Sequence, residues 1–216
     1  MRQIKLIIFD LDGTLVNAYR AVSRSLNFAL KKMGYSALPH VTIKRNVGWG
    51  DKNLISKFVK PQDVARALAV YRRDHQKALK ESVLFLPGAK KVLKELKKKH
   101  YRLAIASNRP TKFTEIILKH LKVRNMFECV LCADKVKRPK PAADLLKGIL
   151  EKAQLKPSQA LYIGDMTIDI TTGMRARVKT IAVATGSCTK KELLGLKPLS
   201  VIHHLKDLMP LVEKIG

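Results

Sequence analysis

The feature that most constrains the fold is a regular alternation of short apolar segments and amphipathic stretches after Pro87-Gly88. Each apolar segment has the residue types of a buried strand, and each is preceded by a stretch with helical spacing. Strands that alternate with helices predict a parallel sheet covered by helices on both faces. The predicted strands of this alternation are 103–106, 129–131, 160–163 and 180–183, and its predicted helices are 89–100, 111–121, 142–153 and 168–175. A further buried strand is predicted at residues 4–9, at the start of the chain.

The segment between the first two predicted strands differs from the rest. Residues 18–81 are mostly helical, with Ala21, Leu26, Ala29 and Leu30 at helical spacing and Gly34 ending that helix. A turn at Gly48-Trp49-Gly50 separates further helices from it. The sequence therefore predicts an α/β protein with a helical insertion after its first strand.

Polar segments follow four of the predicted strands. They are Asp10-Leu11-Asp12-Gly13-Thr14, Ser107-Asn108, Lys140-Pro141 and Gly164-Asp165 with Asp169. Each one alone is typical of a turn or a helix cap. Ligands of parallel sheets bind at the carboxyl ends of the strands. The occurrence of all four in order therefore indicates a site at that edge.

These four segments resemble the motifs of the haloacid dehalogenase superfamily, specifically its phosphohydrolases. Phe9 to Val16 is similar to the first motif nearly letter for letter, and the other three segments resemble the second, third and fourth. The resemblance runs from about residue 4 to residue 183. It implies a Rossmann-like core of residues 1–16 and 85–216, with a small all-helical cap domain of residues 17–84.

The resemblance implies phosphoryl transfer through an aspartyl-phosphate. Asp10 would be the nucleophile, which splits one difficult step into two easier steps. Asp12 would be the general acid for the leaving oxygen and then the general base for water. The dehalogenase branch carries no acidic residue at the position of Asp12, so Asp12 favours phosphate chemistry over carbon–halogen cleavage.

A divalent cation is expected among the carboxylates. Asp10, Asp12 and Asp165 would repel one another without one, and Mg²⁺ prefers oxygen ligands. The resemblance implies that Asp12 offers its backbone carbonyl to Mg²⁺, and that Asp169 either binds the metal or supports its ligands. Mg²⁺ is the cofactor expected.

The remaining motif residues are expected to hold the phosphate. Ser107 and the amides around it would donate to phosphoryl oxygens, and Lys140 would offset negative charge on both the phosphate and Asp10. Thr14 and Asn108 are further candidates for substrate binding. A small phosphorylated anion is the substrate class expected.

The predicted cap contributes its own candidates. Val47-Gly48-Trp49-Gly50 resembles a cap loop of the phosphoglycolate phosphatase and pyrophosphatase branch. Trp49 either closes over substrate with Gly48 or packs the cap against the core. Arg45, together with Lys44 and Lys52, either holds a distal carboxylate or phosphate or forms a solvated surface.

Three residues depart from the pattern of the superfamily. Asn17 replaces Asp and is expected to cap the following helix equally well. Met166 replaces Ser or Thr beside Asp165, which removes a hydroxyl near the carboxylates. Arg177 replaces Gly at a helix end, where a positive φ would cost roughly 1 kcal/mol.

The charge balance leaves a second class of function open. Lys and Arg number 43 against 17 Asp and Glu, a formal net charge of +26. Such a charge attracts anions, including nucleic acid. Aromatic residues make up 6% and are not interleaved with the basic runs, so stacking on bases is not indicated. Lys-rich helix surfaces are the simpler explanation, and a nucleic-acid-associated phosphatase or binding protein is the alternative.

The other titratable residues give no site pattern. Cys129 and Cys132 lie three residues apart on a predicted strand, so their sulfurs point to opposite faces and are read as buried hydrophobes, not as metal ligands. His75, His203 and His204 are read as surface or packing residues. No apolar run is long enough to span a membrane, so a cytoplasmic protein that does not enter a membrane is expected.

The sequence thus predicts a Mg²⁺-dependent phosphatase acting on small phosphorylated metabolites, with phosphoglycolate the first substrate to try. A pyrophosphatase, a sugar-phosphate mutase and a catalytically silent relative remain alternatives. A mutase would have to return the phosphate to substrate and not to water. Either a monomer or a homodimer is compatible with the sequence.

Overall fold

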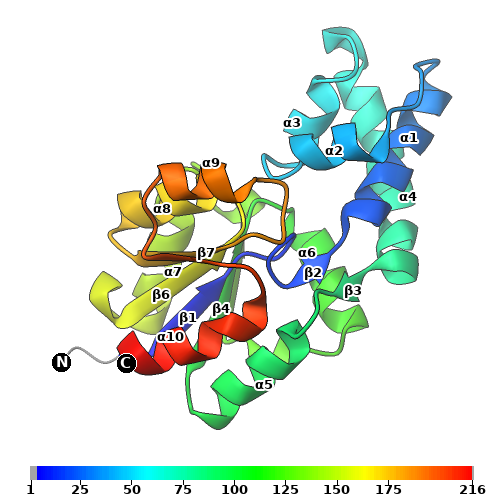
Figure 1. Cartoon of the computed structure of the whole chain (residues 1–216). Coiled ribbons are helices and arrows are strands. Elements are labelled where there is room, and N and C mark those ends of the chain that lie inside the picture. Colours follow the sequence, from blue (N-terminus) through cyan, green and yellow to red (C-terminus); the bar gives the residue numbers. More distant parts are fainter. Residues whose placement is uncertain (1–3, 216) are drawn as a thin grey trace.

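A six-stranded parallel sheet forms the centre of the molecule. The computed structural model describes residues 4–215, and Figure 1 shows the sheet with helices on both of its faces. The strand order β5-β4-β1-β6-β7-β8 places the first strand in the middle, and all five pairings are parallel. The predicted α/β fold is therefore confirmed. The strands are β1 Leu6–Phe9, β4 Arg102–Ser107, β5 Cys129–Cys132, β6 Ala160–Gly164, β7 Lys179–Val183 and β8 Ser200–Ile202.

The central strands are apolar on both faces because helices cover both faces. Ile7 and Phe9 pack on the side of α5, α6 and α10, whereas Leu6 and Ile8 pack on the side of α7 and α8. All four side chains are fully buried. The helices around the sheet are α5 Ala89–Lys98, α6 Thr111–His120, α7 Asp144–Ala153, α8 Thr167–Ala176, α9 Lys190–Gly195 and α10 Leu208–Ile215.

The elements of the sheet and its helices were predicted to within two residues at most ends. Every strand and helix expected between residues 89 and 183 is present. The elements that follow residue 183, namely α9, β8 and α10, were not predicted from the sequence. Short 3₁₀ turns connect the elements, at Pro61–Asp63, Arg124–Met126, Ala133–Lys135, Pro157–Gln159 and Leu205–Asp207.

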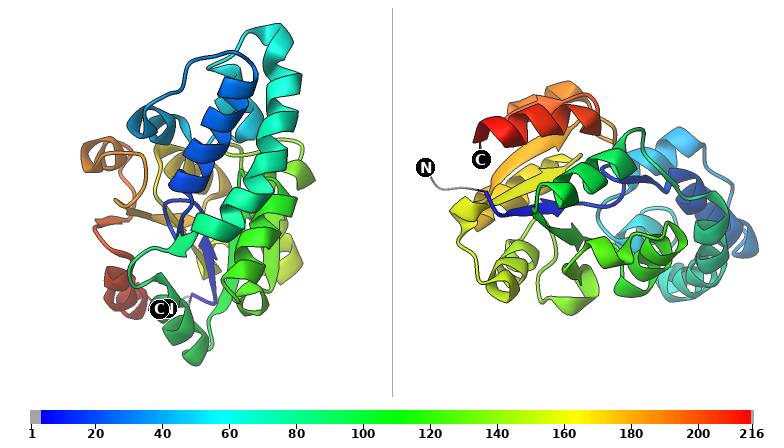
Figure 2. Two further views of the ribbon diagram at one scale, coloured as in Figure 1. Left: turned by 90° about the vertical axis from the view of Figure 1, so that its right-hand side faces the viewer. Right: turned by 90° about the horizontal axis from the view of Figure 1, so that it is seen from below.

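The inserted segment folds into a group of helices with its own apolar core. Figure 2 shows α1 and α4 running side by side beyond the carboxyl ends of the strands. Leu26, Ile43, Ile55 and Tyr71 meet in this second core. The helices are α1 Tyr19–Lys32, α2 His40–Asn46, α3 Asp51–Ser56 and α4 Val64–Ser82. Gly34 follows α1 with a φ of +78°, in agreement with its expected role in ending that helix.

Two short antiparallel strands connect the inserted helices to the sheet. They are β2 Val16–Asn17 and β3 Leu84–Phe85, which pair with each other where the chain leaves and re-enters the core. The pairing holds the two connections together. A cap domain with boundaries at 17 and 84 stays a prediction.

The two cysteines of the CxxC segment are both buried. Cys129 belongs to the core on the α7 side, whereas the thiol of Cys132 lies 3.4 Å from the Thr114 hydroxyl on α6. Their side chains thus occupy opposite faces of the sheet, as the strand spacing predicted. Across residues 4–215, the structure has no helix that is both long and apolar enough to cross a membrane.

Arg177 has the left-handed backbone that was expected from its place at the end of α8. Its φ is +58° and its ψ is +31°, a conformation that costs a residue with a Cβ roughly 1 kcal/mol. We expect Arg177→Gly to raise the free energy of unfolding by up to about 1 kcal/mol, or the melting temperature by about 2–4 °C. Thermal unfolding followed by circular dichroism measures this.

The matched control replaces an exposed residue within the same helix. Met174→Gly introduces the same residue at a helical position and is expected to lower the free energy of unfolding by about 1 kcal/mol. A loss of stability in both variants would contradict the strain assigned to Arg177.

Candidate active site

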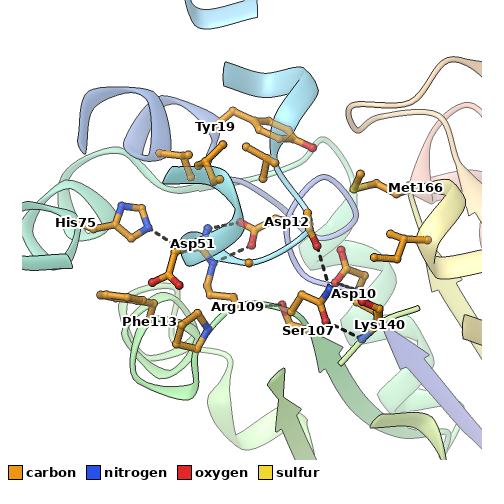
Figure 3. A pocket seen from close by; sticks show the side chains of 18 of the residues that line it. Asp10, Asp12, Tyr19, Asp51, His75, Ser107, Arg109, Phe113, Lys140 and Met166 are labelled. Atoms are coloured by element: carbon orange, nitrogen blue, oxygen red, sulfur yellow. Dashed lines mark hydrogen bonds and ion pairs between the residues drawn. The ribbon is translucent and has the colours of Figure 1, made fainter. Parts of the chain in front are cut away.

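The four polar segments of the sequence converge at the carboxyl ends of the strands. Asp10 directly follows β1, Ser107 ends β4, Asp165 directly follows β6, and Lys140 enters from the loop before α7. Figure 3 shows Asp10, Ser107 and Lys140 lining one pocket between the sheet and the inserted helices, and Asp165 is buried beside Asp10. The fold therefore brings residues that are up to 155 positions apart into one site.

Lys140 lies at the centre of the site and is almost fully buried. Its Nζ donates to Asp10 Oδ1 at 2.7 Å and to Asp169 Oδ1 at 2.7 Å. Burial alone lowers the pKa of Lys140, but the charges of Asp10 and Asp169 outweigh burial and raise this pKa well above its usual value. The side chain is therefore a fixed ammonium group between two carboxylates.

Asp169 anchors this lysine. Its Oδ1 also accepts a hydrogen bond from the Tyr162 hydroxyl at 2.7 Å, and its Oδ2 accepts one from the Met166 backbone N–H at 3.0 Å. Both oxygens are thus occupied by protein donors. Sequence reasoning missed Tyr162, because a tyrosine within an apolar strand looks like an ordinary core residue.

Asp165 is fully buried and only half satisfied. Its Oδ1 accepts from the Thr14 hydroxyl at 2.8 Å, whereas its Oδ2 has no hydrogen-bond partner among the described residues. Gly13, whose φ is +84°, and Gly186 both pack against that oxygen. A Cβ added to Gly13 would lie 2.4 Å from Asp165 Oδ2, and a Cβ added to Gly186 would lie 1.5 Å from it. The chain therefore encloses one unpaired carboxylate oxygen.

Three carboxylates form a cluster that could bind a metal ion. One oxygen each of Asp10, Asp165 and Asp169 lies within 4.8 Å of the others. Burial, together with the neighbouring carboxylates, raises the pKa of Asp10 to about 7 and that of Asp165 well above its usual value. Lys140 supplies one positive charge to three acids, so the donor set and the unpaired oxygen of Asp165 fit a divalent cation.

Ser107, which ends β4, and Asn108, which follows it, line the same pocket as Asp10 and Lys140. The Ser107 hydroxyl accepts from the Arg109 backbone N–H at 3.2 Å. The Asn108 side chain accepts from Lys140 N at 2.9 Å and donates to the carbonyls of Lys140 and Gly48 at 3.0 and 3.1 Å. Asn108 thus ties the Lys140 loop and the inserted helices to β4.

Asp12 is held by a residue that the sequence interpretation did not single out. Arg109 Nε and Nη2 donate to Asp12 Oδ2 and Oδ1, both at 2.8 Å, and Nη1 lies 2.6 Å from His75 Nε2 on α4. The only local signal for Arg109 was its place directly after Ser107-Asn108. His75 is fully buried, so its reading as a surface residue is wrong and its reading as a packing residue is incomplete.

The other candidates from the inserted segment are placed differently. Gly48 lines the pocket, where its φ is +116° and an added Cβ would lie 2.3 Å from Met166 Sδ. Trp49 lines a neighbouring hollow and is 44% exposed. Arg45 does not line the pocket and donates to the Ser187 carbonyl at 2.6 Å. Thr14 lies beneath Asp165 and likewise does not line it.

Comparison with known proteins agrees with this arrangement. The family model described as haloacid dehalogenase-like hydrolase matches residues 7–183, which include all four segments and the inserted helices. The chain belongs to the haloacid dehalogenase-like hydrolase family. The resemblance seen in the sequence is therefore confirmed, and with it the expectation of a phosphatase-type hydrolase.

Several relatives of this haloacid dehalogenase-like hydrolase match over most of their length. A phosphoglycolate phosphatase from Pseudomonas fluorescens is 26% identical over 215 residues, which cover 95% of this chain and 79% of the relative. A pyrophosphatase from Bacillus mycoides is 28% identical and covered to 99% on both sides. The crystal structure of a predicted phosphoglycolate phosphatase from Haemophilus somnus has a TM-score of 0.91 at 25% identity, covering 98% and 99% of the two chains.

The departures from the family pattern have local explanations. Met166 has no hydroxyl to offer the carboxylates, but the Thr14 hydroxyl donates to Asp165. The backbone N–H of Met166 donates to Asp169. The Met166 side chain meets Gly48 of the inserted segment. Asn17 Oδ1 accepts at 3.2 Å from the backbone N–H of Tyr19, the first residue of α1, but the N-cap position is Ala18, so Asn17 itself is not the cap that was expected.

The raised pKa values predict how the metal-free hydrolase responds to pH. The folded state binds protons more tightly than the unfolded state at Asp10 and Asp165, so stability falls as pH rises from about 4 to about 7. Each group contributes up to about 1.4 kcal/mol per pH unit. We expect Asp165→Asn, which removes one of these groups, to gain stability relative to the wild type as the pH rises.

Urea unfolding at pH 5 and pH 7 in EDTA measures this difference. Asp144→Asn is the matched control, because Asp144 carries an exposed ion pair with Arg138 and lies outside the cluster. If the free energies of unfolding of wild type and Asp165→Asn changed in parallel with pH, the burial cost assigned to Asp165 would be wrong.

Proposed function

We propose that this chain is a Mg²⁺-dependent phosphatase that hydrolyses small phosphorylated metabolites through an aspartyl-phosphate. The observation that carries the proposal is the contact of Lys140 Nζ with both Asp10 and Asp169, beside the unpaired Oδ2 of Asp165. This arrangement presents a nucleophilic carboxylate, a fixed cation and a cation-binding edge to one pocket. The similarity to phosphoglycolate phosphatases over at least 95% of this chain supports the substrate class.

Asp10 and Asp165 would hold the metal, with the Asp12 carbonyl as the further ligand that the family resemblance implies. Asp169 would support the site through Lys140, since both of its oxygens already accept protein hydrogen bonds. Bound Mg²⁺ would supply charge that offsets the phosphate and the carboxylates. Gly13 and Gly186 pack against the Asp165 carboxylate so closely that neither position has room for a Cβ.

The chemistry proceeds in two displacements at phosphorus. An oxygen of Asp10 forms a bond to phosphorus while the bond to the leaving oxygen breaks, and Asp12 gives that oxygen a proton. Water then forms a bond to phosphorus and releases Asp10, and Asp12 takes the proton from water. Ser107 and Lys140 stabilise the phosphoryl oxygens by hydrogen bonds and charge in both steps.

The inserted helices act as the cap over this reaction. Asn108 donates to Gly48 O, and Gly48 meets Met166, so the cap loop closes directly over the site. Arg45 joins the cap to the Ser187 loop and to Glu192 at 3.3 Å. We assign Arg45 to holding the cap closed and Trp49 to the rim of the entrance, instead of direct contact with the phosphate.

A pyrophosphatase is the second candidate. The Bacillus mycoides pyrophosphatase matches 99% of this chain and 99% of its own length, which is the observation in its favour. In that case the leaving group would be a second phosphate, and the same nucleophile and acid would act. Turnover of pyrophosphate and phosphoglycolate under the same conditions separates the two candidates.

We expect Asp10→Asn to lower kcat roughly a thousandfold or more on every substrate, because the amide cannot form the phosphoryl bond. Phosphate release is measured with Mg²⁺ and with EDTA on phosphoglycolate, pyrophosphate, a sugar phosphate and a 3′-phosphorylated oligonucleotide. EDTA is expected to abolish release from all of them.

The control is Asp207→Asn. Asp207 ends the 3₁₀ turn before α10, accepts a hydrogen bond from the His204 N–H and does not line the pocket. This variant is expected to keep wild-type turnover. Acid quenching followed by mass spectrometry of the peptide with residue 10 should show one phosphoryl group in the wild type. Normal turnover by Asp10→Asn would show that another residue is the nucleophile.

A further inference from the structure

The pocket contains very few positive charges for so basic a chain. Among the residues that line it within 4–215, only Lys140 and Arg109 are cationic. Lys140 is already bound to Asp10 and Asp169. A negative group on a substrate that extends beyond the scissile phosphate therefore meets one candidate cation, the guanidinium of Arg109.

Arg109 engages Asp12 through both oxygens of the carboxylate. Nε and Nη2 each donate at 2.8 Å, and the arginine side chain is 7% exposed. Such a bidentate pair is among the strongest hydrogen-bonded contacts between side chains. While the pair is formed, each oxygen of Asp12 accepts from the guanidinium, so Asp12 must turn away from Arg109 before both oxygens are free for a substrate or for water. The proposed acid and base is thus engaged elsewhere before substrate binds.

His75 fixes Arg109 without removing its charge. A guanidinium only donates, so His75 Nε2 accepts from Nη1 and the ring proton lies on Nδ1, which donates to Ser25 Oγ at 3.2 Å. Burial and the charge of Arg109 lower the pKa of His75 to about 2, so the ring stays neutral. The ring itself is held between Tyr71 and Phe113.

The other acid in this part of the pocket is already neutralised. Asp51 accepts from Arg72 Nε and Nη2 at 2.7 and 3.1 Å. Its negative charge is therefore offset by Arg72. An incoming anion thus competes with Asp12 for the guanidinium of Arg109. The planar, two-donor edge of an arginine matches a carboxylate or a phosphate equally well.

We propose that Arg109 is a specificity-determining residue that binds a second anionic group of the substrate and so releases Asp12 for proton transfer. The inference rests on the proposed phosphatase function. In the exchange itself the guanidinium only moves its hydrogen bonds from Asp12 to the substrate. Asp12 leaves the pair as a carboxylate and takes up a proton from water or from a protonated phosphate oxygen of the substrate before it acts as the acid. A phosphate ester with a carboxylate or second phosphate close to the scissile group is turned over well, and a matched uncharged ester leaves Asp12 bound and is turned over slowly.

Two esters of nearly equal shape test the proposal: phosphoglycolate, and 2-hydroxyethyl phosphate, in which a neutral alcohol replaces the carboxylate. We expect the wild type to prefer phosphoglycolate in kcat/KM by roughly 10- to 100-fold. Arg109→Gln is expected to remove most of that preference by lowering kcat/KM for phosphoglycolate and by raising it for 2-hydroxyethyl phosphate, because the guanidinium no longer holds Asp12. Arg109→Lys keeps the charge without the two-donor edge, and it is expected to retain part of the preference.

The control is Arg138→Gln, which breaks a bidentate arginine–carboxylate pair with Asp144 on the surface. It is expected to keep the wild-type ratio. Melting temperatures show whether each variant is folded, and Arg109→Lys serves if Arg109→Gln does not fold.

Two results would overturn the proposal about Arg109: a wild type without preference for the anionic ester, or an equal fall on both esters with an unchanged ratio in the Arg109 variants. The second result would leave Arg109 as a residue that only positions Asp12. Release of phosphate from neither ester by the wild type would instead contradict the phosphatase function itself.

Discussion

The structure depends on the burial of three carboxylates at one end of a parallel sheet, next to a single lysine. Asp10, Asp165 and Asp169 lose hydration there, which is costly unless each charge is paired or protonated. Lys140, Thr14 and Tyr162 supply donors to this cluster, and yet Asp165 Oδ2 keeps none. The Asp165 carboxylate also fills the space beside Gly13 and Gly186, so that neither position has room for a larger residue.

The fold could be predicted because its determinants are local. Apolar strands and amphipathic helices alternate within short windows, and Asp10 and Ser107 lie beside predicted strand ends. The contacts of Arg109 could not be predicted, because it meets Asp12 across 97 positions and His75 across 34. Arg45 reaches the Ser187 loop across 142 positions, and nothing in the cap sequence distinguishes that contact from a substrate contact.

The large net charge acts on anions at long range, whereas the few cations in the pocket act only on a ligand in direct contact with them. A net charge of +26 raises the local concentration of anions around the whole molecule. Selection among those anions depends on the few buried donors that a ligand touches. A buried arginine in a closed pocket discriminates strongly, since leaving its charge unpaired is costly. The basic surface therefore need not bear on which phosphorylated molecule is hydrolysed.

Calorimetric titration of Mg²⁺ into the metal-free protein tests the central claim, that the buried carboxylates require one cation beyond Lys140. The account predicts one Mg²⁺ per chain in the wild type. It also predicts that Asp165→Asn abolishes this binding, because the substitution removes the carboxylate whose oxygen lacks a partner. Failure of the wild type to bind Mg²⁺, or binding that survives Asp165→Asn, would contradict the account.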